Sequence, residues 1–180
     1  MDMFLTGTPQ TLLDILDNKE ERERYKLQQL AEFPTCQLVS IGINIPGDIK
    51  TNESIEKVFN LATEAFERYL MDNELIIRHV RKKYNPTGPE FYTLIDSERN
   101  DIKRLCINFE TFHQVGRLLD IDVYQRDEAG EMLIIDRDFY NLPSRRCYVC
   151  QKPAKECTRA KTHSIDDLRT KINKMCQSLI

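Results

Sequence analysis

Residues 110–123 read Glu-Thr-Phe-His-Gln-Val-Gly-Arg-Leu-Leu-Asp-Ile-Asp-Val. The end of this stretch alternates apolar and acidic residues, as expected for a β-strand with one buried face. Because side chains alternate along a strand, Asp120 and Asp122 point to one face, whereas Ile121 and Val123 face the core. Two carboxylates on one face repel each other unless a cation lies between them. The stretch therefore predicts a strand that carries a Mg²⁺ (or Mn²⁺) site, although a solvated strand face would give the same pattern.

A return strand supplies a candidate third metal ligand. Residues 119–124 and 131–137 are both rich in β-forming residues, and the turn-forming residues between them predict a hairpin. Pairing across this hairpin brings Asp136 or Asp138 close to Asp120. We take Asp138 as the predicted third ligand.

The residues just upstream of the acid pair add groups that suit phosphate chemistry. Gly116 offers a backbone N–H and Arg117 a fixed positive charge to a phosphate. His113 is a candidate catalytic residue, as a base or a phosphate contact, although a lone histidine is more often structural. The same two interpretations apply to Glu110. Metal-bound oxygens and fixed cations are what phosphoryl or nucleotidyl transfer requires.

The C-terminal segment, residues 143–180, is basic. It carries nine Lys or Arg against three Asp or Glu, while the whole chain has a net charge of −3. Cations that a loop holds near a carboxylate pair are typical of phosphate clamps. The candidate substrate-binding cations are Arg145, Arg146, Arg159 and Lys161.

The same segment contains a candidate zinc site. The spacing Cys-x2-Cys-x6-Cys-x5-His is compatible with tetrahedral Zn²⁺, although reduced cysteines that pack a loop against the sheet would also explain it. These four residues are Cys147, Cys150, Cys157 and His163. The other cysteines, Cys36, Cys106 and Cys176, occur singly in apolar or helical contexts, so we expect them to be buried.

Length and composition predict a single domain over residues 1–180, and the predicted helices and strands make its class α+β. The 180-residue chain is 41% hydrophobic and 31% charged, which is typical of a globular protein. It contains no apolar run long enough to cross a membrane and no secretory signal pattern, so we expect a cytoplasmic protein.

Three helices are predicted. The first covers residues 9–31 and is capped by Thr8, and the second covers residues 52–72. The third starts at Ser164, with Asp167 completing a capping box. Further predicted strands are 36–47, 75–83, 90–96 and 102–109.

Residues 110–123, followed by Arg137-Asp138, Leu142-Pro143 and the Arg145–His163 motif, resemble the apo-citrate lyase phosphoribosyl-dephospho-CoA transferases. These are the holo-acyl-carrier-protein synthases of citrate lyase. The similarity continues upstream in the same order and covers nearly the whole chain. The upstream matches are Glu21-Arg22, Leu38–Ser40, Pro46-Gly47, Ile49-Lys50 and Gly88–Glu90.

This resemblance implies an enzyme that transfers 2′-(5″-triphosphoribosyl)-3′-dephospho-CoA to a serine of the citrate lyase acyl carrier protein and releases pyrophosphate. It implies a nucleotidyltransferase-like mixed β-sheet flanked by helices, in which Asp120 and Asp122 are the family's acidic pair. It also implies that Arg117, Arg145 and Arg146 hold the triphosphate. The implied partners are the carrier protein and the donor, with no nucleic acid and no membrane.

Two other functions remain open at this point. A zinc-stabilised module that binds nucleic acid or protein would use the Cys147–His163 segment as its structural centre. It would need exposed aromatic residues among the cations, and the acidic pair would repel nucleic acid. A thiol enzyme would use Cys147 or Cys150 as nucleophile and His163 as base, but the segment offers no oxyanion site.

Overall fold

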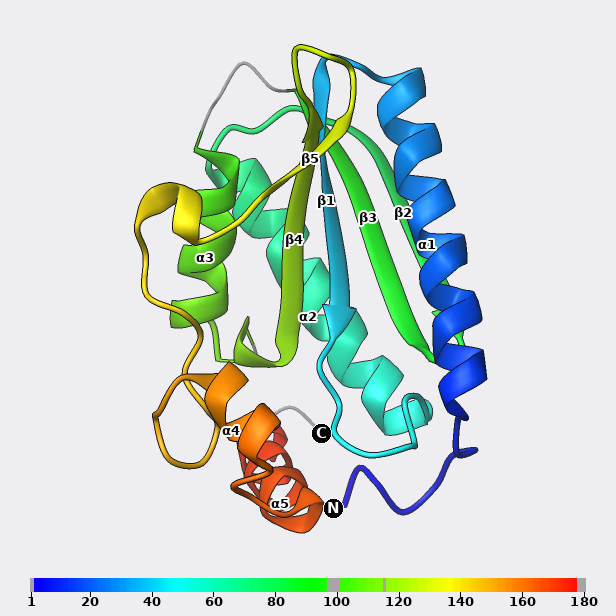
Figure 1. Ribbon diagram of the computed structural model, residues 1–180, viewed down its shortest axis with the longest axis vertical. Helices are drawn as coiled ribbons and strands as arrows, with labels where there is room; N and C mark the ends of the chain where they lie inside the picture. The colour runs from blue at the N-terminus through cyan, green and yellow to red at the C-terminus, as the bar shows by residue number, and fades with distance from the viewer. Residues whose placement is uncertain (1, 97–100, 115, 178–180) are drawn as a thin grey trace.

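A computed structural model describes residues 2–96, 101–114 and 116–177. The chain has the predicted α+β composition, with helices before, within and after one sheet (Figure 1). In chain order, the elements are α1 (Leu12–Glu32), β1 (Cys36–Ile43), α2 (Glu53–Asp72), β2 (Ile77–Asn85), β3 (Gly88–Asp96), α3 (Ile102–Phe112), β4 (Leu119–Arg126), β5 (Met132–Ile135), α4 (Ala154–Ala160) and α5 (Ile165–Cys176). Single 3₁₀ turns occupy Gly116–Leu118 and Asp138–Tyr140.

The five strands of the described chain form one sheet in the order β2-β3-β1-β4-β5. Every pairing is antiparallel, where a mixed sheet was expected. The reason lies in the connections, which form a split βαβ arrangement. Helix α2 links β1 to β2 across β3, and α3 links β3 to β4 across β1. Strands joined by a helix are therefore never neighbours, and each neighbouring pair runs in opposite directions.

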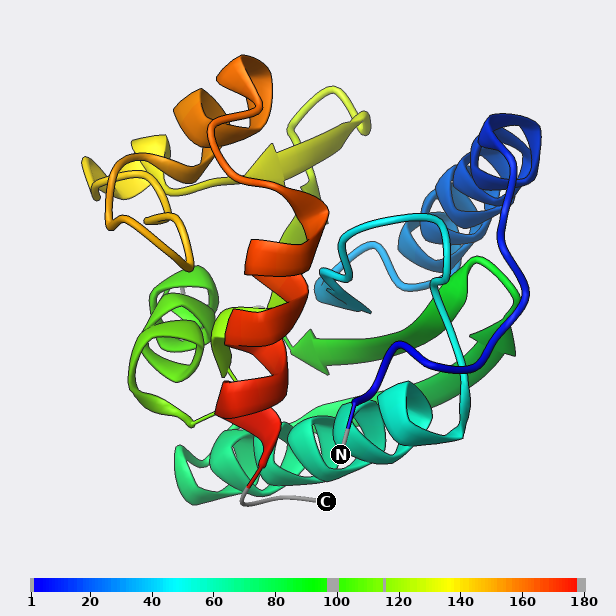
Figure 2. The same cartoon turned by 90° about the horizontal axis from the view of Figure 1, so that it is seen from below.

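The helices lie on both faces of the sheet. Figure 2 shows α2 beneath one face and α1 over part of the opposite face, which leaves the sheet between α1 and the C-terminal helices uncovered by a helix. A small apolar cluster lies beneath α1, around Leu30, Leu38 and Tyr92. In the described ranges, no helix combines the length and apolar character needed to cross a membrane.

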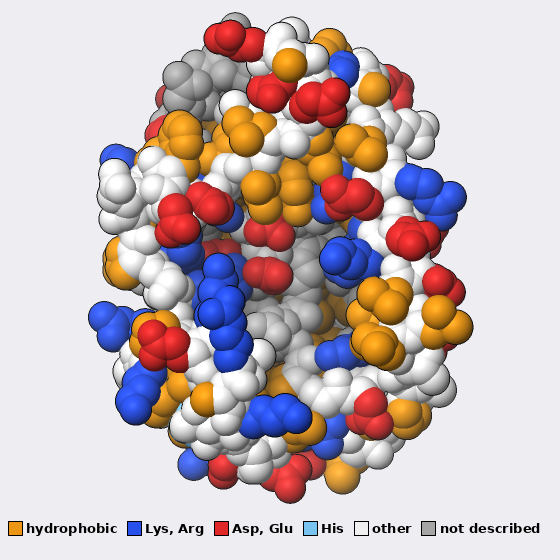
Figure 3. Space-filling model, in the orientation of Figure 1, with side chains coloured by type: hydrophobic (Ala, Val, Ile, Leu, Met, Phe, Trp, Pro, Cys, Tyr) orange, Lys and Arg blue, Asp and Glu red, His pale blue; other side chains and the backbone are white. Residues whose placement is uncertain are grey.

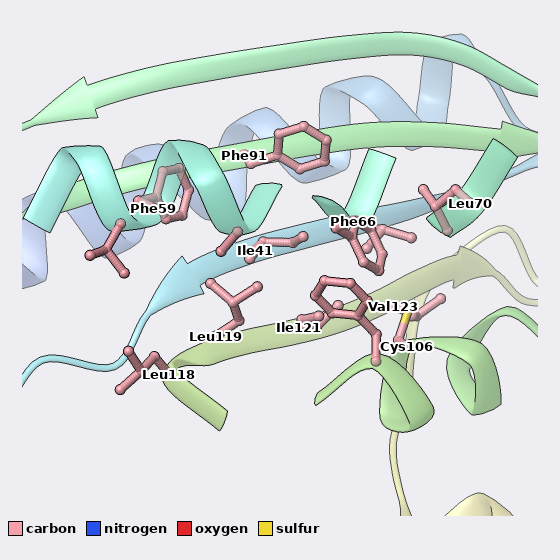
Figure 4. Close-up of a cluster of buried hydrophobic side chains, with 14 of the residues drawn as sticks. Ile41, Phe59, Phe66, Leu70, Phe91, Cys106, Leu118, Leu119, Ile121 and Val123 are labelled. Atoms are coloured by element: carbon pink, nitrogen blue, oxygen red, sulfur yellow. The ribbon is translucent and has the colours of Figure 1, made fainter. Parts of the chain in front are cut away.

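The main core lies between the sheet and helices α2 and α3 (Figure 4). The fully buried ring of Phe66 on α2 makes edge-to-face contacts with Phe91 of β3 and Phe109 of α3, with centroid distances of 6.4 and 5.1 Å. Ile121 and Val123 of β4 point into this core, as the alternation of residues 119–124 predicted. Their neighbours on β4 consequently point to the other face.

Besides the mixed sheet, two predictions about individual elements are wrong. Residues 102–109, predicted as a strand, belong to helix α3, because Ile102, Leu105, Cys106 and Phe109 have the i, i+3, i+4, i+7 spacing of one buried helical face. The first helix is capped by Thr11 instead of Thr8.

The reason for the later start of α1 is a capping box. The Thr11 hydroxyl accepts from the Asp14 N–H, and the Asp14 carboxylate accepts from the Thr11 N–H. The residue before Thr11 does not join the helix, since the Gln10 N–H donates to the Asp48 carbonyl in the loop after β1.

The final helix begins as predicted, with Ser164 and Asp167 forming a capping box. Ile172 and Cys176 of this helix are fully buried in the main core. The predicted burial of Cys36, Cys106 and Cys176 is confirmed. The C-terminal helix is thus part of the same packed structure as the sheet.

We predict that Phe66→Ala lowers the free energy of unfolding by about 3–5 kcal/mol, because it removes a fully buried ring and leaves a cavity. Urea denaturation followed by circular dichroism measures the change. Leu61→Ala on the same helix is the control, since Leu61 is 38% exposed and its loss should cost about 1 kcal/mol or less. Equal losses for the two variants would contradict the assignment of Phe66 to the centre of the core.

Candidate active site

The acid pair lies on the uncovered face of the sheet. On β4, Asp120 pairs with Gly42 of β1 and Asp122 pairs with Ser40. The Asp120 side chain is 61% exposed, and a Cβ added to Gly42 would meet nothing within 4 Å. Figure 3 shows this face hollowed, with acidic side chains in the hollow and Lys and Arg side chains around it. Asp120 therefore stands over open space that a ligand can enter, and the half-buried Asp122 lies beside it on the same face.

The two carboxylates differ in their surroundings. Burial, followed by the charge of Asp120, raises the pKa of Asp122 above its ordinary value. The Tyr124 hydroxyl lies 3.5 Å from Asp122 Oδ2, and Lys26 Nζ of α1 donates to the Tyr124 oxygen at 3.1 Å. The carboxylates repel each other in the absence of a cation, which fits the chemistry of a divalent metal site.

Two buried charged residues of α3 hold the backbone between the acids. In the described chain, pairing between β4 and β5 begins only at Val123, so the outer edge of Ile121 needs other partners. The Ile121 N–H donates to Glu110 Oε1 at 3.1 Å, and Lys103 Nζ donates to the Ile121 carbonyl at 2.6 Å. Glu110 and Lys103 are 3% and 5% exposed. Helix α3 thereby fixes the position of the strand that carries the acid pair.

Glu110 also joins the acid pair to the C-terminal segment. Arg137 Nη2 lies 2.5 Å from Glu110 Oε2, and Arg145 donates to Glu110 Oε1. The same Arg145 guanidinium reaches Asp120, with Nη1 at 3.2 Å from Oδ1. Arg145 therefore lies between a buried carboxylate, which anchors it, and an exposed carboxylate, which faces the open hollow.

A cavity of about 900 Å³ opens beside Arg145. Asp120 and Asp122 do not line it, but Arg145 connects them to it. Its only acidic lining residue among those described is Glu110, which is already paired with two arginines. Such a cavity favours anionic ligands. The cations that line it are Arg117, Arg137, Arg145, Arg146 and Lys161.

The predicted phosphate-binding residues fall in different places. Arg117, Arg145, Arg146 and Lys161 line the cavity, whereas Arg159 is an exposed residue of α4 outside its lining. Arg117 donates to the Arg146 carbonyl and lies over the Tyr148 ring, with 5.6 Å from its Cζ to the centroid. Tyr148 donates to the Arg117 carbonyl at 3.0 Å. These contacts tie the two neighbouring parts of the cavity wall together.

Gly116 lines the cavity, but its N–H donates to the His113 carbonyl at 3.0 Å. That bond occupies the group that was expected to contact a phosphate. A Cβ at this position would lie 2.2 Å from the Phe109 carbonyl oxygen. The close approach of the chain to α3 therefore explains this glycine.

The structure does not bring His113 to the acid pair. Its ring stacks on Phe109 with a centroid distance of 4.5 Å, and it does not line the cavity. Burial, together with the charge of Arg68, lowers the pKa of His113 below its ordinary value. These surroundings are those of a structural histidine that ends α3, and they place it away from the groups it was predicted to assist.

Asp138 is likewise separated from the predicted metal site. The register of the hairpin, with Val123 opposite Ile135, would place residue 138 opposite Asp120. However, β5 ends at Ile135, and the chain turns into a 3₁₀ helix in which Asp138 is exposed. Within the described residues, no third carboxylate joins the acid pair in a cluster of three metal-ligating side chains.

The four predicted zinc ligands do converge. Their ligand atoms lie within 4.8 Å of one another, which makes this a candidate metal site. Cys150 Sγ lies 3.4 Å from Cys157 Sγ and 3.1 Å from His163 Nε2. Burial alone would raise the pKa of Cys147, but the backbone N–H groups of Cys150 and Val149 bring it below its ordinary value. Nearby amide donors favour a thiolate, the form that binds metals.

Sequence reasoning missed Lys26, Lys103 and Tyr124, and left Glu110 undecided. A signal for two of them exists: Lys103 and Glu110 are charged residues seven positions apart on the buried face of α3. Charged residues on such a face need partners, so they mark a buried polar network. The signal was hidden because residues 102–109 were assigned to a strand.

We predict that the Asp122 carboxyl titrates above the ordinary aspartate pKa of 3.8, and that Asp120→Asn lowers its pKa. Removing the neighbouring charge makes ionisation easier, whereas the remaining burial still opposes it. Carboxyl-carbon NMR titration of the metal-free protein measures both values. The control signal is Asp96, whose pKa is lowered by its hydrogen bond with Arg78 and should not respond. An unchanged Asp122 titration in the variant would contradict the pairing of the two acids.

Comparison with known proteins places the chain in a family. The family model described as apo-citrate lyase phosphoribosyl-dephospho-CoA transferase matches residues 10–179. The chain is 33% identical over 177 residues to a probable transferase of this name from Streptococcus pyogenes serotype M18, covering 98% of the chain and 91% of that protein. The transferase of this name from Citrobacter koseri is 33% identical over 155 residues, which is 86% of the chain and 82% of that protein. Protein CitXG of Leuconostoc mesenteroides subsp. cremoris is 33% identical over 175 residues, but the chain spans only 37% of its length. The chain therefore belongs to the apo-citrate lyase phosphoribosyl-dephospho-CoA transferase family.

Proposed function

We propose that this protein transfers 2′-(5″-triphosphoribosyl)-3′-dephospho-CoA to a serine of the citrate lyase acyl carrier protein. The serine oxygen forms a bond to the phosphorus nearest the ribose and loses its proton, and the bond to pyrophosphate breaks. The observation that carries the proposal is the acid pair joined by Arg145 to a cation-lined cavity, in a chain that belongs to this family.

Asp120 and Asp122 are the residues that would hold Mg²⁺ (or Mn²⁺). Their mutual repulsion and the exposure of Asp120 to the hollow support this assignment. When bound, the cation neutralises charge that develops on the transferred phosphoryl group. Because Glu110 and Lys103 hold the backbone at Ile121, the carboxylates keep their positions without rearrangement during the reaction.

The arginines and Lys161 of the cavity would bind the triphosphate and the departing pyrophosphate. Arg145 is best placed to contact the transferred group, since it lies 3.2 Å from Asp120. Arg117, Arg146 and Lys161 lie further along the cavity wall, where they would stabilise the leaving group. Apolar residues of α5, Ile165 and Leu168, line another part of the wall and suit the less polar portions of the donor.

The competing interpretations receive less support. Carboxylates in the middle of the hollow face would repel nucleic acid, which argues against a nucleic-acid binding module. Cys147 is 5% exposed and contacts the other predicted zinc ligands, which argues against a catalytic thiol. The six cysteines are free, which supports a reducing compartment, and we place the reaction in the cytoplasm on that basis.

We predict that Asp120→Asn lowers the transfer rate by more than about 100-fold, because one carboxylate of the metal site is lost. The assay measures the mass of the carrier protein after incubation with the donor and Mg²⁺, where transfer adds the donor minus pyrophosphate. Asp138→Asn is the matched control and should retain the normal rate, since Asp138 is exposed and apart from the pair. A folded Asp120→Asn variant with a normal rate would refute the assignment.

We predict that Arg145→Ala raises the KM for the donor by roughly tenfold or more, the effect of losing charge-assisted hydrogen bonds to a phosphate. Initial rates at varied donor concentration provide the measurement. Arg159→Ala removes a cation from the same segment outside the cavity, and its KM should stay within about twofold of the original, as expected for a solvated charge. If both variants changed KM equally, general electrostatic attraction would explain the effect better than a specific contact.

A further inference from the structure

We infer that the C-terminal arm, residues 143–163, is held together by one structural Zn²⁺ ion, which fixes the cations of the cavity. Zinc binding stands independently of the proposed function, whereas its effect on the donor rests on that function. The ligands are Cys147, Cys150, Cys157 and His163.

The ligand atoms lie near the spacing of a tetrahedron around a single ion. With Zn–S bonds of about 2.3 Å and a Zn–N bond of about 2.0–2.1 Å, neighbouring ligand atoms lie about 3.5–3.8 Å apart. Here Cys150 Sγ is 3.4 Å from Cys157 Sγ and 3.1 Å from His163 Nε2, and no pair exceeds 4.8 Å. Three sulfurs and one imidazole nitrogen form a closed ligand set, which is typical of structural zinc sites.

The backbone around the first two cysteines has the form of a metal-binding turn. The Val149 N–H donates to Cys147 Sγ at 3.4 Å, and the Cys147 N–H donates to the Lys152 carbonyl at 2.7 Å. Gln151 has a left-handed backbone with φ of 64°, a conformation that is unfavourable for a residue with a side chain. A metal that binds Cys147 and Cys150 would hold this tight turn in place.

The arm needs such a link because it has almost no core of its own. Cys147 and Cys157 are its only buried residues and both are ligands, while the half-buried Tyr148 packs against the main core and not within the arm. Its single helix, α4, is seven residues long, and Val149 is 40% exposed. Segments that cannot bury enough apolar surface are commonly held by disulfides or metal ions. The cysteines of the arm are free, which leaves the metal.

The site is continuous with the cavity. Arg145 and Arg146 directly precede the first ligand, and Cys157 and His163 line the cavity wall together with them. The Arg146 carbonyl accepts from Arg117, so the arm also contacts the segment that leads into β4. Loss of the ion would free the arm and displace the cations that face the donor.

The first test measures metal content. We expect about one zinc per chain by elemental analysis of the purified full chain, and Co²⁺ substitution should give the sulfur-to-metal charge-transfer bands of a tetrahedral thiolate site. The Cys147→Ser/Cys150→Ser variant should lose the zinc. The control is Cys36→Ser, in which a buried cysteine outside the cluster is changed and about one zinc per chain should remain. A wild-type chain that binds neither zinc nor Co²⁺ after reduction would overturn the proposal.

The second test separates the metal site from the proposed function. A zinc-selective chelator, used with excess Mg²⁺, should raise the donor KM at least about tenfold and expose the arm to trypsin, and added zinc should reverse both changes. A zinc-containing protein that never modifies the carrier would refute the proposed function but leave the metal site in place. Unchanged KM and unchanged cleavage after complete zinc removal would refute the structural role.

Discussion

The carboxylate of Glu110 makes the contacts on which the candidate site depends. It is almost fully buried, and it accepts from the Ile121 N–H, Arg137 and Arg145. A buried charge is costly unless it is paired and hydrogen-bonded, and here each oxygen has a cationic partner. One side chain therefore fixes the strand that carries the acid pair and the arginine that stands beside it. Helix α3 can supply this group only because the split βαβ connection places it next to the edge of β4.

The site contains groups of charges of both signs, which bound ligands would neutralise. Asp120 and Asp122 repel each other on the open face, while several cations line the cavity and the one acidic residue in its described lining is already paired. A divalent cation would relieve the first imbalance and a polyphosphate the second. Arg145 lies between the acid pair and the cavity, and it contacts Asp120 on one side and Glu110 on the other. This juxtaposition matches the needs of metal-assisted phosphoryl transfer, in which both the metal and fixed cations stabilise the same group.

The C-terminal chain contributes to the site in two physically different ways. Helix α5 is anchored by the main core, through Ile172 and Cys176. The preceding arm, residues 143–163, is held by polar contacts to Arg117 and Glu110, by the ring of Tyr148 packed against the main core, and, as we propose, by a metal ion bound to its cysteines and His163. A segment held mainly by polar contacts can present several cations to a cavity, since it does not have to bury them. Because α5 anchors the C-terminal chain in the core, the arm before it can carry basic residues that line the cavity.

The sequence by itself determined the features that depend on local periodicity and spacing. The alternation of residues 119–124 predicted the face of Asp120 and Asp122, and the Ser164 capping box predicted the start of α5, because neighbouring residues decide both. The spacing of the cysteines predicted that they converge. The helical spacing of Ile102, Leu105, Cys106 and Phe109 is also a local pattern, although residues 102–109 were predicted as a strand. Tertiary structure alone decided the rest. Asp138 lies apart from the acid pair because β5 ends after four residues. The roles of Glu110, Lys103 and Tyr124, and the position of His113 away from the acid pair, depend on contacts between elements distant in the chain. The spacing of Lys103 and Glu110 on one helical face marks them as buried charges, but it does not identify their partners.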